Sequence, residues 1–150
     1  MGFDISGFDD ALAELDRIGR IDEIAPKMLE ESEPILAEEV TKQAKKHWNT
    51  GDMAQSIKST GALVGKGGGY YLCVRPTGES SEKKWEYAGS KSGKKGRRKV
   101  KVRNMEKAVW LEFGAKGRPA VPIITTAVLN AEPAVLKKLQ EVFDREVGSE

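Results

Sequence analysis

Apolar side chains in the N-terminal third of the chain recur with a helical period. Between Ile21 and His47 they lie three or four residues apart, which is typical of one face of an amphipathic helix. This pattern predicts a helix over about 22–48. Pro34 has no amide hydrogen to donate, so we expect it to kink this helix or divide it near Ser32. The same period over residues 8–18 predicts a short helix before it.

Shorter apolar runs in the middle of the chain are typical of strands. Residues 57–64 and 70–75 are expected to form a hairpin, with the glycine-rich segment 65–69 as its turn. A short strand is also expected at 85–88, and another near residues 100–102, where valines alternate with cations.

The helical period returns near the C-terminus. Asn104 is a suitable N-cap for a helix over 105–112, and Gly114 is a suitable stop. A final helix is expected over 123–147, which Pro133 breaks or restarts. Its expected core face consists of Ile124, Val128, Leu129, Val135, Leu136, Leu139 and Phe143.

These elements predict an α+β fold, in which N-terminal helices and a C-terminal helix pack on a small, mostly antiparallel β-sheet. With 150 residues, the chain is expected to form a single domain, 1–150. Within it, 1–48 is helical, 49–114 holds the sheet and a basic loop at 89–103, and 115–150 holds a proline-punctuated link and the last helix.

The net charge of +2 conceals a strong asymmetry. Residues 1–40 hold twelve acidic and three basic side chains, a net charge of −9, whereas residues 91–103 hold eight cations and no acid. Blocks of like charge repel themselves and favour a partner of opposite sign. That partner is a phosphate backbone, the acidic segment of a neighbouring copy, or the acidic half of the same subunit.

Candidate catalytic chemistry is sparse. The chain has one Cys and one His, which excludes an internal disulfide and a Cys-based zinc site. We expect His47 to be structural and Cys73, in an apolar run, to be a buried inert thiol. No apolar run approaches the roughly 20 residues of a membrane span. The sequence therefore predicts no enzyme, no cofactor, no metal site and no membrane partner.

Two segments resemble elements of one protein family. Residues 49–57, Asn-Thr-Gly-Asp-Met-Ala-Gln-Ser-Ile, resemble a TG-x-L-x-x-SI element, with Met53 in place of the usual Leu. Residues 109–114 resemble an aliphatic-Glu-aromatic-Gly turn, which leads through Arg-Pro-Ala-x-Pro at 118–122 into the last helix. The family is the tail-completion, or head–tail joining, proteins of long-tailed bacteriophages and prophages. The resemblance spans about 48–128; Ile123 replaces a usual aromatic residue, and the basic stretch 89–103 is longer than expected.

The resemblance implies a structural virion protein of the phage neck. Such proteins form rings, commonly hexamers, between the head connector and the tail tube with its terminator, after assembly in the host cytoplasm. They perform no reaction and hold no cofactor. The residues matching the family motifs, which we treat as candidate motif and interface residues, are Thr50, Gly51, Ser56, Ile57, Glu112, Phe113, Gly114, Arg118, Pro119 and Pro122.

The basic stretch has two candidate roles in a ring. It could line the channel and contact DNA, or it could contact the neighbouring subunit; the candidate residues are Lys94, Lys95, Arg97, Arg98, Lys99, Lys101 and Arg103. A ring needs head-to-tail contacts, in which one face of a subunit meets a different face of the next. The acidic N-terminal segment and the basic stretch provide two such unlike faces. The alternative function is a small nucleic-acid-binding module that uses residues 91–103 for salt-dependent, sequence-blind binding. We further expect Gly114 to adopt a positive φ and its turn to set the angle of the last helix.

Overall fold

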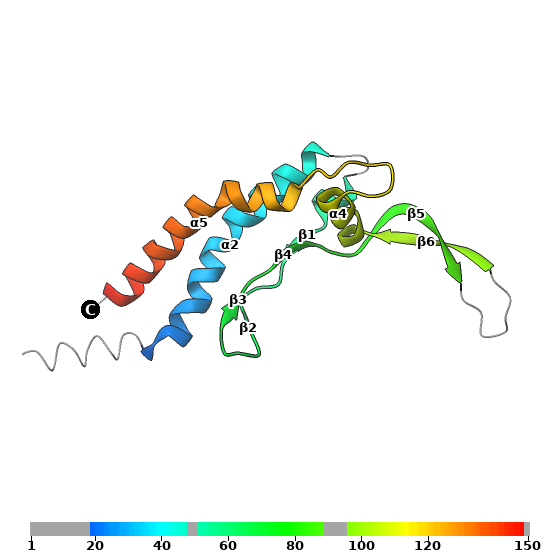
Figure 1. The fold of residues 1–150 in the computed structure, drawn as a ribbon. Coiled ribbons are helices and arrows are strands. Elements are labelled where there is room, and N and C mark those ends of the chain that lie inside the picture. The colour runs from blue at the N-terminus through cyan, green and yellow to red at the C-terminus, as the bar shows by residue number, and fades with distance from the viewer. Residues whose placement is uncertain (1–18, 48–50, 89–95, 149–150) are drawn as a thin grey trace, which may run out of the picture.

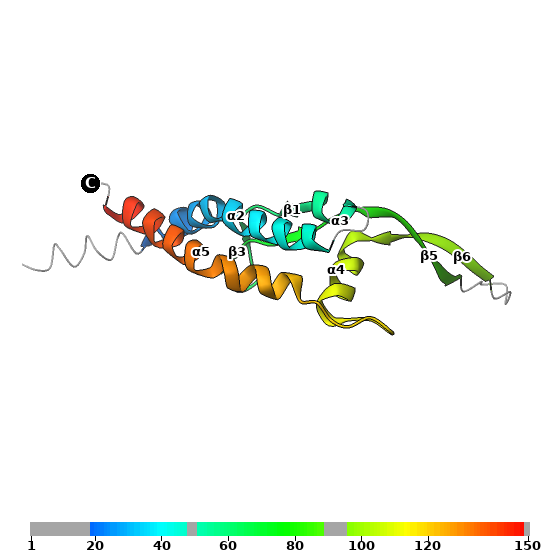
Figure 2. The ribbon, with the colours of Figure 1, turned by 90° about the horizontal axis from the view of Figure 1, so that it is seen from above.

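Two long helices, α2 (Ile21–Lys46) and α5 (Ile123–Gly148), lie side by side at one end of the molecule (Figures 1 and 2). The computed structural model describes residues 19–47, 51–88 and 96–148, so the helix expected over 8–18 lies outside the described residues. The helices run antiparallel, because Lys27 early in α2 pairs with Glu146 late in α5, at 2.6 Å. Ile24, Val40, Ala127 and Val142 are buried along the pair.

Both long helices contain prolines without being divided. Pro26 and Pro34 lie inside α2, and Pro133 lies inside α5. The helix expected over about 22–48 is therefore confirmed over Ile21–Lys46. Of the two outcomes expected at Pro34, a kink or a division near Ser32, the division does not occur, and α5 is not divided at Pro133. α2 contacts α5 on both sides of Pro34, through Glu31 with Arg145 before it and Glu39 with Asn130 after it, and these contacts offset the hydrogen bond that a proline cannot donate.

The predicted α+β class is confirmed. The strands form three separate antiparallel ladders rather than one continuous sheet. The first hairpin is interrupted where the hydroxyl of Thr60 accepts the backbone N–H of Cys73, at 3.1 Å, and Gly61 turns with φ +70°. The paired strands are β1 (Ile57–Ser59) with β4 (Val74–Pro76), β2 (Leu63–Val64) with β3 (Tyr70–Tyr71), and β5 (Glu79–Ala88) with β6 (Gly96–Arg103).

The prediction that Cys73 is buried is wrong. Cys73 lies between β3 and β4 and is exposed, like Tyr71 and Arg75 at alternate positions, whereas Leu72 and Val74 are half-buried. The turn expected at 65–69 is confirmed, since Gly65 donates its N–H to the carbonyl of Gly69 at 2.7 Å.

The β5–β6 hairpin extends away from the helical pair, with α4 (Asn104–Phe113) between them (Figure 1). The strand expected at 85–88 is longer than predicted, and the strand expected near 100–102 is confirmed. That strand covers 96–103, so this part of the expected basic loop is not a loop; residues 89–95, with Lys94 and Lys95, lie outside the described residues. Asn104 is not the N-cap that the sequence predicts. Its buried amide instead donates to the carbonyl of Thr77 at 2.8 Å, which ties α4 to the segment before β5.

The hydrophobic core lies where α2, α4, α5 and the single-turn helix α3 (Asp52–Gln55) meet. The prediction for the core face of α5 is partly wrong, because α2 covers only one side of that helix. Val128, Leu129 and Leu136 are exposed, and the buried side chains are Ile123, Ala127, Ala131 and Val142. Within the described part of the chain, no helix is long and apolar enough to cross a membrane.

Candidate functional site

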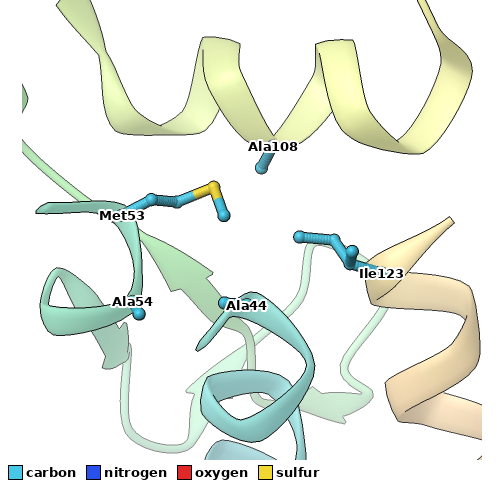
Figure 3. Packing of buried hydrophobic residues seen from close by; sticks show 5 residues of the cluster. All are labelled: Ala44, Met53, Ala54, Ala108 and Ile123. Atoms are coloured by element: carbon cyan, nitrogen blue, oxygen red, sulfur yellow. The ribbon is translucent and has the colours of Figure 1, made fainter. Parts of the chain in front are cut away.

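The two segments that resemble a family meet in the core of the fold. Met53, from the first segment, and Ile123, from the second, reach toward one another beneath Ala108 (Figure 3). Ile57 and Leu111, also from the two segments, pack against this cluster. Two stretches far apart in the sequence thus build one junction, which joins the helices to the strands.

Glu112 caps the N-terminus of α5. Its carboxylate accepts the backbone N–H groups of Ile124, at 2.8 Å, and Thr125, at 3.0 Å, together with the Thr125 hydroxyl. Partial burial acts to raise the pKa of Glu112, but these hydrogen bonds outweigh it, so the pKa lies below its usual value. A helix N-terminus also favours a negative charge. Glu112 therefore fixes where α5 begins relative to α4.

Gly114 allows the chain to turn tightly between these two helices. Its φ is +78°, as the sequence predicts, and a Cβ there would lie 3.1 Å from the backbone nitrogen of Ala120 and 3.1 Å from the carbonyl oxygen of Arg118. The N–H of Val121 donates to the carbonyl of Leu111 at 2.6 Å, which holds the returning chain against α4. Pro122 precedes α5, and its carbonyl accepts the N–H of Thr126 at 3.2 Å.

The first motif segment ties α3 to the strands. The carboxylate of Asp52 accepts the N–H of Ser81 at 2.8 Å and its hydroxyl at 2.7 Å, a partner that the sequence did not reveal. The carbonyl of Ser56 accepts both the N–H and the hydroxyl of Thr77, each at 2.9 Å. Gly51 precedes α3 with φ +75°, and Thr50 lies outside the described residues.

A small cleft of about 110 Å³ opens where the two motif segments reach the surface. Its lining includes Gly51, Arg118 and Pro119 from the motifs, together with an ion pair between Lys107 and Glu82, at 3.1 Å. His47 and Trp110 also line it. Among the residues that the structure describes, no group of three His, Cys, Asp or Glu side chains could hold a metal ion.

The basic strand β6 presents its cations to solvent: Arg97, Arg98, Lys99, Lys101 and Arg103 are all exposed. The base of the hairpin is fastened to α4 by an ion pair between Lys84 and Glu106, and the Lys84 ammonium lies 5.8 Å from the ring centre of Trp110. The hairpin thus has a defined direction relative to the body. Neither Lys84 nor Glu106 stood out in the sequence, because their contact joins segments that are distant along the chain.

Two carboxylates of the acidic segment are engaged by nearby side chains. Glu31 pairs with Arg145 of α5, whose hydrogen bonds lower the pKa of Glu31 to about 2. Hydrogen bonds from Asn130, Lys42 and Gln43 lower the pKa of Glu39 to about 2 as well. The acidic helix and the basic strand lie in separate parts of the molecule (Figures 1 and 2). Part of the N-terminal acidity therefore serves to hold α2 and α5 together.

Two rows of apolar side chains remain uncovered, one on each of the helices that meet at Gly114. The α4 stripe consists of Met105, Val109 and Phe113, spaced by one helical turn, with Phe113 77% exposed. The α5 stripe consists of Val128, Leu129 and Leu136, with Leu129 62% exposed. Exposed apolar side chains that lie in a row are candidates for a contact surface.

No protein-family model matches this chain, and the searches of curated proteins and of solved structures found none that is similar to it.

Proposed function

We propose that this chain is a structural protein whose subunits assemble with one another through unlike surfaces. More particularly, we propose a ring-forming tail-completion or head–tail joining subunit of a phage neck, which lies between the head connector and the tail tube. The observation that carries the proposal is the pair of uncovered apolar stripes on α4 and α5 of one subunit. In a ring, one face of each subunit meets a different face of the next.

The energetic case rests on side chains that are costly to leave in water. Full burial of a Phe or Leu side chain contributes about 1.5–3 kcal/mol relative to exposure. Phe113, at 77% exposure, and Leu129, at 62%, have most of that contribution still to gain. We propose that the α4 stripe of one subunit packs against the α5 stripe of its neighbour, and that this contact repeats around the ring.

The motif residues support the proposal through geometry. Glu112 and Gly114 lie at the junction between α4 and α5, so they fix the angle between the two stripes. The angle between the two contact surfaces of a subunit decides whether a head-to-tail assembly closes into a ring or grows into a filament. This gives a physical reason why a ring-forming protein would need this motif, which resembles that of the tail-completion family.

The function itself is passive in this proposal. The ring would join a filled head to a completed tail by presenting one surface to the connector and another to the tail tube or its terminator. Assembly in the host cytoplasm and residence in the virion follow from that role. No bond is made or broken, and no cofactor takes part.

The direct test is the mass and shape of the purified protein. We expect mass photometry and negative-stain electron microscopy to reveal closed rings of one size, which Phe113→Ser dissociates. Val64→Ser is a matched control, because Val64 is 64% exposed but lies on β2, away from both stripes. A monomer at every concentration, or equal dissociation by the control variant, would contradict self-assembly through these stripes.

The neck assignment needs a separate test. In a phage or prophage that carries this gene, a stop codon early in it should yield filled heads and complete tails that remain unjoined. Purified wild-type protein added to such a lysate should restore joined particles. Normal joined particles without the subunit would refute the assignment to the neck while leaving self-assembly untouched.

A further inference from the structure

The β5–β6 hairpin has two chemically different faces. Residues directly opposite one another in an antiparallel ladder share a face, and successive residues alternate between faces. Lys83 lies opposite Lys101, and Trp85 lies opposite Lys99. The pairs between them, Lys84 with Val100 and Glu86 with Arg98, occupy the other face.

The second of these faces is partly engaged within the subunit. Lys84 pairs with Glu106 of α4, whereas Val100 borders an open groove that Lys101 also lines. Glu86 pairs with Arg98, at 3.4 Å. The carboxylate of Glu86, within the ladder between Lys83 and Lys101, therefore belongs to this face.

The first face is cationic and aromatic. Lys83, Lys99 and Lys101 are exposed on it, together with Trp85, which is 62% exposed. The Lys99 ammonium lies over the indole ring of Trp85, 5.1 Å from the ring centre, which is within the range of a cation–π contact. Lys83 and Lys101 stand directly opposite, an arrangement in which like charges repel and weaken the ladder. An anionic ligand would remove that repulsion.

We infer that this aromatic–cationic face, formed by Lys83, Trp85, Lys99 and Lys101, binds single-stranded nucleic acid. Side chains two residues apart on one strand lie roughly 7 Å from each other, so the lysines form a row that can follow an extended phosphate backbone. Trp85 supplies a platform on which an unpaired base stacks, a contact that tolerates any base. The inference does not depend on the proposed role in a phage neck.

The same features disfavour two other ligands. A duplex keeps its bases paired and stacked, so it offers Trp85 no free base face. The acidic helix α2 of a second copy is a weaker partner for this cationic face than the sequence indicates, because two of its carboxylates already have partners. Glu31 pairs with Arg145. Glu39 accepts hydrogen bonds from Asn130, Lys42 and Gln43. It also has no aromatic side chain to meet the indole.

The test measures binding of a fluorescein-labelled oligothymidylate of about 15 nucleotides by anisotropy. We expect Trp85→Ala to weaken binding by about 5- to 150-fold, the range found for loss of one stacked base. Tyr71→Ala is the matched control, because Tyr71 is also an exposed aromatic residue but lies on β3. It should leave the affinity unchanged.

A salt titration tests the phosphate contacts. Lys99→Ser should make the slope of log K against log salt shallower by about 0.7, the value for one phosphate contact on a single strand. Arg98→Ser removes the same charge one residue away, on the opposite face, and should change the slope by less than half as much. Circular dichroism of each variant establishes that it is folded.

Four outcomes would overturn the inference. The first is no binding of the oligonucleotide at low salt, and the second is equal affinity of Trp85→Ala and wild type. The third is an affinity for duplex DNA that equals the affinity for the single strand and does not change on Trp85→Ala. That result would show that the face binds the duplex phosphate backbone. The fourth is a change of oligomeric state on Lys99→Ser with no change in oligonucleotide binding, which would make the face a subunit contact.

Discussion

Substitution of Gly114 should destabilise the fold for two separable reasons. With φ +78° and ψ 171°, Gly114 occupies a backbone region that is essentially restricted to glycine. Forcing another residue into such a region costs about 1–3 kcal/mol. In addition, the new Cβ would lie 3.1 Å from two backbone atoms, on Ala120 and Arg118, neither of which can rotate away as a side chain does.

Together these effects predict that Gly114→Ala lowers the free energy of unfolding by at least about 2 kcal/mol. For a chain of this size, that loss corresponds to a fall in Tm of roughly 4–8 °C. Gly114→Val, which is larger and branched, should yield no soluble folded protein. Urea denaturation followed by far-UV circular dichroism measures the loss for the Ala variant.

Gly117 provides the matched control in the same turn. Its φ is +77°, but a Cβ there would meet nothing within 4 Å, so Gly117→Ala carries the cost of a positive φ without the steric conflict. We expect Gly117→Ala to lose about 1 kcal/mol, clearly less than Gly114→Ala. Equal losses for the two variants would refute the steric part of the reasoning, and normal folding of Gly114→Val would refute the role of the turn.

Three further predictions concern contacts of the junction. Glu112→Gln should lower the free energy of unfolding by about 1 kcal/mol at pH 7; because hydrogen bonds depress the pKa of Glu112, this contribution is present above the unfolded pKa of about 4.3 and is lost as pH falls through the folded value. Urea titrations over a series of pH values should thus show a gap between wild type and variant that narrows as the pH falls below about 4.3, and a gap that does not depend on pH would exclude the ionised cap. Asp52→Ala should cost about 0.5–1.5 kcal/mol, because the exposed donors of Ser81 exchange the carboxylate for water, and a thermal melt identical to that of wild type would contradict this. A double-mutant cycle of Lys84→Met and Glu106→Gln should give a coupling of about 0.5–1 kcal/mol, and zero coupling would show that the partly exposed pair does not fasten the hairpin.

The period of the apolar residues was sufficient to predict the helices, but not which of their side chains other elements would bury. The spacing of apolar residues correctly indicated α2, α4 and α5, because each helix has a face that must leave water. The same spacing on α5 could not show that small residues, Ala127 and Ala131, would be the buried ones, since that depends on how closely α2 approaches. Leu129 and Leu136 were therefore assigned to a core from which the fold excludes them.

The strands and the candidate sites depended on long-range pairing, which single-sequence reasoning does not provide. The register that separates Trp85 and Lys99 from Glu86 and Arg98 is a property of two strands together. Likewise, Glu112 and Gly114 were recognised by pattern, but the hydrogen bonds of Glu112 to α5 required the fold. Asn104 was assigned to a helix cap from its neighbours in the sequence, but its side chain donates a hydrogen bond to the distant carbonyl of Thr77 instead.

The proposal that unlike surfaces of the subunit dock head to tail is tested most directly by cross-linking two single-cysteine variants. Phe113→Cys and Leu129→Cys would each be made in a Cys73→Ser background, because Cys73 is itself exposed, and mixed under mild oxidation. Head-to-tail docking of the α4 stripe on the α5 stripe predicts disulfides between the two variants, identified by mass spectrometry, and few disulfides between copies of the same variant. Cross-links mainly between like variants, or none at all, would contradict it.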